Sequence, residues 1–156
     1  MSELQDISED DYRRLAEVRY RIRLFQHFSE QAARGAGLEP QQHQLLLAIR
    51  GLPAGQHATI GELAQRLQLH HHSTVGLVDR LEHSGLVVRR HASTDRRQVL
   101  VVLTPRGTAM LHELSRHHLA ELRTQGRDLV LALEALLRRR RAGSGRRPRP
   151  APVRNG

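Results

Sequence analysis

The 156-residue sequence contains no cysteine and no tryptophan, and only two tyrosines and two phenylalanines. Without cysteine the chain can form no disulfide, offers no thiolate to a metal and has no thiol for redox sensing. No apolar run approaches the roughly 20 residues of a membrane-spanning helix, so we expect no membrane partner. The N-terminus is acidic and polar, unlike a secretory signal, which predicts a cytoplasmic location.

The sequence motifs of common enzyme classes are also missing. There is no glycine-rich phosphate loop, no HExxH and no GxSxG. The acidic residues are scattered over the surfaces of the predicted helices instead of forming a cluster. We therefore expect no enzymatic activity, no catalytic residues and no cofactor.

Positive charge is distributed unevenly along the chain. The formal net charge is +9, but the last 19 residues carry eight arginines and no acidic residue. The preceding residues hold 17 arginines against 16 acidic residues, and their only basic region is 66–106. The glycine- and proline-rich composition predicts a disordered Arg-rich tail over 142–156. This tail either adds salt-dependent affinity for nucleic acid or is an extension without a role.

Apolar spacings of three and four residues predict a mainly helical chain. A capping-box pattern at Thr59 and Glu62 and the Thr104-Pro105 pair mark two helix starts, and Gly85 marks a helix end. The β-branched runs on either side of HASTDRR predict a two-stranded hairpin. The predicted helices are 9–34, 40–50, 60–67, 70–84 and 105–141, the last of which Gly126 divides or kinks.

This order of elements describes a winged helix-turn-helix, a mainly α fold with a two-stranded β wing. The terminal helices are longer than so small a core needs, and their leucine stripes favour a second copy of the chain as partner. We divide the chain into four parts: an N-terminal dimerisation helix (1–38), a DNA-binding lobe (39–104), C-terminal dimerisation helices (105–141) and the tail (142–156).

Residues 38–111 contain four stretches whose combination is specific: LEPQQHQLLLAI, TIGELAQRL, STVGLVDRLEHSGLVVRR and STDRRQVLVVLTPRG. Together they resemble the MarR (multiple-antibiotic-resistance regulator) family of winged helix-turn-helix transcription factors. The resemblance implies a homodimer that binds double-stranded DNA at a pseudo-palindromic operator and usually represses transcription. It also implies, as in many relatives, a small-molecule ligand that lowers DNA affinity and lies between the dimer helices and the lobe.

Three consecutive histidines at 70–72 raise the question of a metal site. Neighbouring side chains on a helix point about 100° apart, and no two of the eleven histidines are separated by three or four residues. We therefore predict no metal site and place His71 and His72 in the first turn of the recognition helix. Phosphates favour the imidazolium cation, so DNA affinity should rise as the pH falls from 8 to 6. Alternatively, these rings are packed against a neighbouring helix or simply solvated.

The remaining DNA-contacting candidates lie on the recognition helix and the wing. Thr74 either contacts DNA or is buried in the core. In the wing, arginines enter the minor groove while Asp95 pairs with one of them and shapes the tip, as the resemblance also implies. Arg89, Arg90 and Arg106 are expected to contact phosphates. The predicted DNA-binding residues are His71, His72, Ser73, Thr74, Gly76, Arg80, Arg89, Arg90, Asp95, Arg96 and Arg97.

Two other functions are compatible with the same residues. The chain is either a non-specific architectural DNA-binding protein that uses its tail or, less favoured, a metal-responsive regulator. A specific regulator would prefer its operator over other DNA by about a thousandfold or more. Tyr12 and Tyr20 could line a pocket for a small aromatic or phenolic ligand, or they could be ordinary packing residues.

Overall fold

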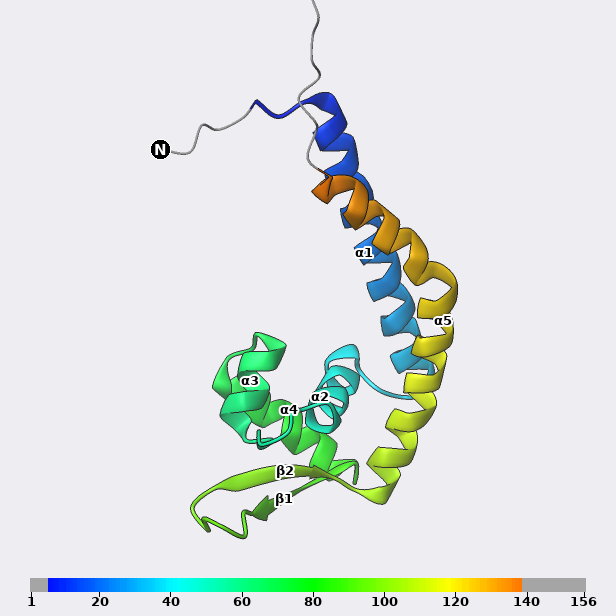
Figure 1. Cartoon of the computed structure of the whole chain (residues 1–156). Helices are drawn as coiled ribbons and strands as arrows, with labels where there is room; N and C mark the ends of the chain where they lie inside the picture. The colour runs from blue at the N-terminus through cyan, green and yellow to red at the C-terminus, as the bar shows by residue number, and fades with distance from the viewer. Residues whose placement is uncertain (1–5, 139–156) are drawn as a thin grey trace, which may run out of the picture.

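The computed structural model describes residues 6–138, and the predicted tail at 142–156 lies outside them. Over this range the chain forms five helices and a two-stranded antiparallel hairpin (Figure 1). No helix among these residues is long and apolar enough to cross a membrane. The elements are α1 (Glu9–Gly35), α2 (Pro40–Arg50), α3 (Ile60–Leu67), α4 (His71–His83), β1 (Val87–His91), β2 (Val99–Leu103) and α5 (Pro105–Leu137).

Two long helices extend away from a smaller lobe. In Figure 1, α1 and α5 lie side by side, while α2, α3, α4 and the hairpin gather at one end of the pair. Arg21 links the outer parts of the pair through an ion pair with Asp128, 3.0 Å between Nη1 and Oδ2. The predicted mainly α winged helix-turn-helix fold with a two-stranded wing is confirmed.

The helix starts follow from local capping. Thr59 accepts a hydrogen bond from the Glu62 N–H at 3.2 Å, and Thr104 accepts one from the Gly107 N–H at 3.0 Å. The predicted capping box at Thr59 is only half formed, because the Glu62 carboxylate binds the Arg66 guanidinium one turn later instead. Gly85 has φ +70°, a conformation that side chains with a Cβ rarely adopt, and it ends α4 as predicted.

The core joins the lobe to the long helices. Leucines from α2, α3 and α4 form its centre, Val87 and Val101 cover it from the hairpin, and Ala33, Leu111 and Leu114 continue it onto α1 and α5. The helix α5 runs without interruption through Gly126, so Gly126 does not divide it into two helices. The fully buried leucines are Leu45, Leu46, Leu63, Leu77 and Leu81.

One face of α5 exposes large apolar side chains along its length. They recur at spacings of three and four with Gly126 in register, which places them on a single side of the helix. Within residues 6–138 these side chains are only partly covered, although apolar side chains of this size are normally buried. We call these residues the α5 stripe: Leu119, Leu122, Val130, Leu133 and Leu137, which are 38–77% exposed.

Candidate nucleic-acid interface

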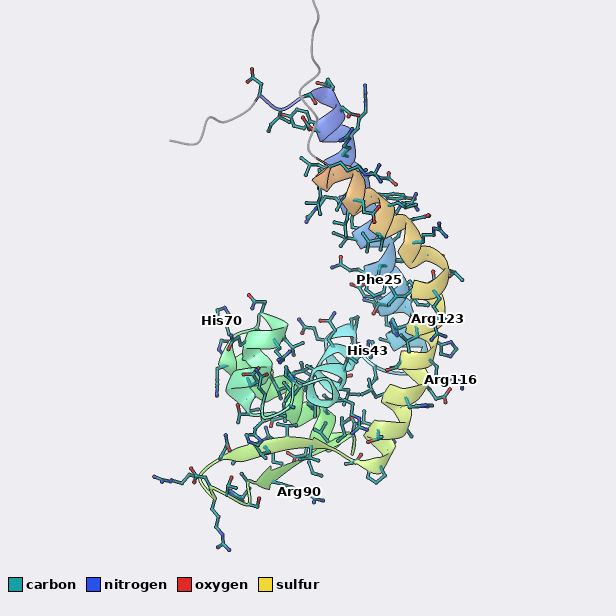
Figure 2. All side chains as sticks on the ribbon, in the orientation of Figure 1. Phe25, His43, His70, Arg90, Arg116 and Arg123 are labelled. Atoms are coloured by element: carbon teal, nitrogen blue, oxygen red, sulfur yellow. The ribbon has the colours of Figure 1, made fainter. Side chains whose placement is uncertain are left out.

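The first turn of α4 presents polar groups to solvent. His70 is the N-cap residue, and His71, His72 and Ser73 are exposed. The rings of His70 and His72 stack, with their centroids 5.6 Å apart and their planes within 7°. Figure 2 labels His70 in the lobe. The first backbone N–H groups of a helix have no partner within the helix, so this turn offers hydrogen-bond donors and the positive end of the helix dipole to an anion.

Thr74 does not belong to this surface. Its side chain is fully buried, and its hydroxyl donates to the His70 carbonyl at 3.1 Å. It lies three residues before Leu77 and therefore on the inward face of α4. Its inclusion among the DNA-contacting residues is wrong, and the alternative of a buried position is correct.

Further along α4, Arg80 is exposed and Gly76 is partly buried. A Cβ added to Gly76 would lie 3.7 Å from the Arg80 guanidinium, which is an ordinary van der Waals contact. The packing of the protein itself therefore does not require glycine at this position.

Arg89 connects the wing to the recognition helix. Its backbone N–H donates to Glu82 at 3.0 Å, and its guanidinium donates both to Glu82 and, at 2.5 Å, to Asp79. Burial lowers the pKa of this guanidinium, but its hydrogen bonds to the two carboxylates outweigh burial and raise it. These ion pairs direct the Arg89 guanidinium toward α4, and its predicted phosphate contact stays a prediction.

The wing tip has the shape that its Asp-Arg-Arg sequence predicts. The Asp95 carboxylate accepts the Arg97 N–H at 2.9 Å and pairs with the Arg97 guanidinium at 3.5 Å. His91 Nδ1 lies 2.7 Å from the Arg96 carbonyl and fixes the other side of the turn. The Arg97 side chain is 95% exposed, and within residues 6–138 neither Arg90 nor Arg96 has a carboxylate partner. These arginines are available to an anionic partner.

Sequence reasoning missed the contacts between the start of α5 and the end of α4. Arg106, predicted to contact phosphate, donates to the Ser84 carbonyl at 3.1 Å. Gly107 lies so close to Leu86 that an added Cβ would be 2.0 Å from the Leu86 carbonyl oxygen. The LTPRG motif was the sequence signal for this close contact, because it places a glycine in a helical turn, where glycine is otherwise unfavourable.

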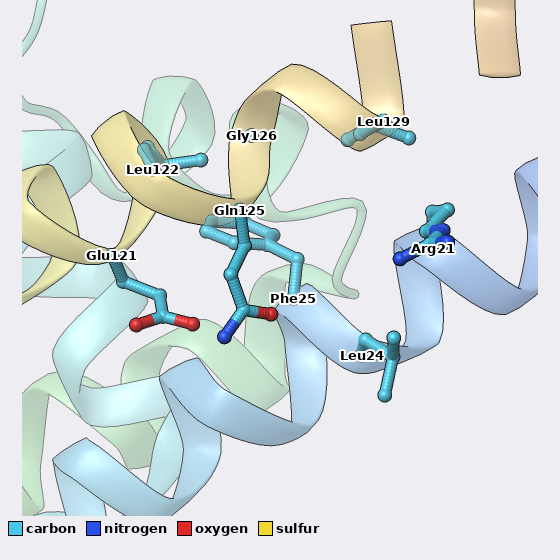
Figure 3. A pocket seen from close by; sticks show the side chains of 8 residues that line it. All are labelled: Arg21, Leu24, Phe25, Glu121, Leu122, Gln125, Gly126 and Leu129. Carbon is cyan, nitrogen blue, oxygen red and sulfur yellow. The ribbon is translucent and has the colours of Figure 1, made fainter. Parts of the chain in front are cut away.

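Two hollows lie between the packed helices α1 and α5. The narrow one holds little more than a single water, about 20 Å³, and lies among Phe25, Leu122 and Gly126 (Figure 3). The larger groove of about 640 Å³ has an apolar floor that includes Phe28 and Met110. Tyr12 and Tyr20 line neither hollow. The larger groove is bordered by the polar side chains of Gln31, Arg106, Glu113 and His117.

Metal binding has no support in the described part of the chain. Among residues 6–138 no group of three or more histidine, aspartate and glutamate side chains is arranged to hold an ion. His70 and His72 are stacked ring on ring, with no carboxylate completing a ligand set.

Comparison with known proteins gives a consistent family. The sequence model described as MarR family matches residues 36–98. The HTH-type transcriptional repressor YetL of Bacillus subtilis is 30% identical over 97 residues, which are 62% of this chain and 57% of YetL. The curated relatives that the chain matches are covered over only 38% and 57% of their lengths.

Solved structures agree over a longer part of the chain. The MarR family regulator AbsC of Streptomyces coelicolor has a TM-score of 0.63 and 26% identity, covering 83% of this chain and 84% of AbsC. CouR of Rhodococcus jostii RHA1, solved bound to p-coumaroyl-CoA, has a TM-score of 0.61 and 25% identity, covering 86% and 98%.

Proposed function

The chain belongs to the MarR family of winged helix-turn-helix transcriptional regulators, and on that premise we propose that it is a homodimer that binds a specific, pseudo-palindromic DNA operator. One observation carries the proposal. The first turn of α4 and the wing tip are both exposed, and both present N–H groups that can donate hydrogen bonds to a partner. Such a pair of elements suits a major groove and the neighbouring minor groove.

The proposed contacts divide into two kinds. His71, His72 and Ser73 enter the major groove at the N-terminus of α4, and Arg80 lies further along the same exposed side. Arg90, Arg96 and Arg97 bind phosphates or the minor groove, with Asp95 holding the tip. Phosphate contacts position the protein, whereas base-edge contacts read the sequence.

A second copy of the chain is the proposed cover of the α5 stripe. The stripe has the spacing of a helix-packing seam, and exposed apolar patches of this kind mark association sites. A two-fold dimer also places two α4 helices on successive major grooves, as an operator with symmetric half-sites requires.

We further propose that the protein is a repressor released by a small aromatic or phenolic ligand. The groove of about 640 Å³ between α1 and α5 falls in the range of roughly 300–1,000 Å³ typical of ligand pockets. Its apolar floor suits an aromatic ring, and Arg106 and His117 at its border suit a polar or acidic substituent. The relative CouR was solved with p-coumaroyl-CoA bound.

Selection of genomic DNA fragments by the full-length protein tests the DNA function. The expected result is one shared motif with two symmetric half-sites about 10 base pairs apart, centre to centre. A non-specific architectural protein would instead recover fragments without a common motif. The fragments would also identify the genes adjacent to the operator.

Lysine substitutions distinguish the two neighbouring arginines of β1. Lysine keeps the positive charge but cannot form the two-carboxylate fork of Arg89. We expect Arg89→Lys to weaken operator binding about tenfold, corresponding to about 1.4 kcal/mol, and Arg90→Lys to change it little. Arg90→Gln should reduce the slope of log K against log salt by about 0.9, while Arg89→Gln, which also removes a charge, should leave the slope unchanged. Fluorescence anisotropy at several salt concentrations measures all four variants. An equal reduction of the slope in Arg89→Gln would show that Arg89 contacts phosphate.

A further inference from the structure

Two histidines are buried where the lobe meets the long helices. His43 of α2 is 4% exposed and His118 of α5 is 9% exposed. Their rings stack with centroids 4.7 Å apart and planes inclined by 18°. Figure 2 shows His43 between α2 and the long helices. Fully buried polar residues are uncommon, and the DNA-binding surface described above does not use this pair.

Hydrogen bonds place one hydrogen of the His118 ring. Its Nδ1 lies 2.7 Å from the Leu114 carbonyl oxygen, which only accepts, so Nδ1 carries the hydrogen. Its Nε2 lies 2.9 Å from the Ser29 hydroxyl, which donates to this nitrogen when the ring is neutral. The edge-on ring of Phe28 covers a further side, with centroids 5.7 Å apart. The neutral ring is thus satisfied at both nitrogens and connects α1, α2 and α5.

No carboxylate balances a proton on this pair. Burial, followed by the proximity of His118, lowers the pKa of His43, and no acidic group contributes to that shift. Glu30 of α1 pairs with Arg34, and Glu113 of α5 pairs with Arg116. Other titratable groups on the same three helices include His27, Glu39, His117 and Glu121, all of which are exposed or partly exposed.

We propose that the stacked His43–His118 pair is a proton-operated contact that holds the lobe on the long helices while the His43 ring is neutral and releases it when that ring is protonated. Protonation places an uncompensated cation in an apolar site, against a second imidazole at stacking distance. Undocking α2 lets water solvate the cation. The contact joins α2, which packs against α4 in the lobe with the proposed DNA site, to α5, which lines the proposed ligand groove, so its state affects the relative position of the two sites.

The direction of the pH effect follows from the lowered pKa of His43. A group with a lowered pKa when docked takes up its proton more readily when undocked. Docking is therefore strongest above the ordinary imidazole pKa of about 6.5 and weakens as the pH falls through that value. If only the undocked form takes up the proton, the docking equilibrium falls about tenfold between pH 7.5 and pH 5.5.

Hydrogen exchange of the full-length, untagged chain tests the contact without DNA. With exchange times scaled to the intrinsic rates, we expect the protection of α2 to fall by up to about tenfold from pH 7.5 to pH 5.5. In His43→Phe, which keeps a flat stacking ring but cannot titrate, the fall should be less than about twofold. His27→Gln, at an exposed histidine of α1 outside both proposed sites, should behave as the unsubstituted chain. An equal loss of protection in His43→Phe would overturn the proposal.

Two further measurements keep the test decisive if His43→Phe fails to fold. His43→Gln replaces the titrating ring with a smaller side chain. In this variant too, the protection of α2 should fall by less than about twofold. Ring C2–H NMR of the unsubstituted chain should show the His43 ring titrating below the ordinary imidazole pKa of about 6.5. Rings that all titrate together would contradict the proposal.

The consequence for DNA rests on the proposed function. Protonation of His71 and His72 should raise operator affinity on acidification, whereas undocking should oppose that rise. Operator affinity of His43→Phe should therefore rise more steeply from pH 7.5 to pH 5.5 than that of the unsubstituted chain. If no operator is found, the proposed DNA function is contradicted. The proton-operated contact is not affected by that result, because hydrogen exchange tests it without DNA. Parallel pH profiles in the presence of an operator would contradict the link from the pair to DNA binding.

Discussion

Replacing Gly107 with alanine is expected to lower the free energy of unfolding by about 3 kcal/mol or more, at or above the usual range for overpacking. The new Cβ would lie 2.0 Å from the Leu86 carbonyl oxygen and 3.0 Å from its carbon. Both are backbone atoms, and the Thr104 N–H holds that carbonyl at 3.0 Å, so it cannot rotate away as a flexible side chain could. Relief requires α5 to move off the start of the wing.

Urea unfolding followed by circular dichroism measures this effect. Gly61→Ala is the matched control, because Gly61 lies in the first turn of α3 and an added Cβ would meet nothing within 4 Å. That control should leave stability unchanged or raise it by up to about 1 kcal/mol. Equal stability of the two variants would show that α5 does not approach Leu86 as closely as described.

Two glutamates on the α5 stripe are expected to convert the protein to a monomer and to weaken operator binding by about a hundredfold or more. Leu119 and Val130 are each 52% exposed in the single chain, so Leu119→Glu with Val130→Glu should leave the protomer folded. In a dimer the same carboxylates would be buried without partners, which is strongly unfavourable. A monomer also loses the second half-site.

Sedimentation equilibrium reports the oligomeric state, and anisotropy reports the affinity. Thr124→Glu with Leu131→Glu adds the same charge on a side of α5 well away from the stripe, where the exposed residues are mostly polar. This control should remain dimeric. A dimeric stripe variant would show that another surface joins the two copies.

Local chemistry explains why the helix boundaries could be predicted. The starts at Thr59 and Thr104 depend on hydrogen bonds between residues three positions apart, and the end at Gly85 depends on one positive φ. Such interactions are written into a few consecutive residues. Thr74 was also within reach of sequence analysis, because it shares the inward helical face of Leu77 and Leu81.

Other features depend on the folded chain and left no local signal. Arg89 looks like a phosphate contact in sequence, but the carboxylates that bind it lie on α4, seven and ten residues earlier. His43 and His118 meet only because α2 docks on α5. Each is an ordinary helix residue by spacing, so only their tertiary contact identifies them as a pair.

The most direct test of the DNA function is the ratio of two affinities. The full-length protein is titrated against its selected operator and against a scrambled duplex of equal length and composition, at one physiological salt concentration. The proposed function predicts at least about a thousandfold tighter binding to the operator. Equal affinities for the two duplexes would contradict sequence-specific regulation and favour a non-specific architectural role.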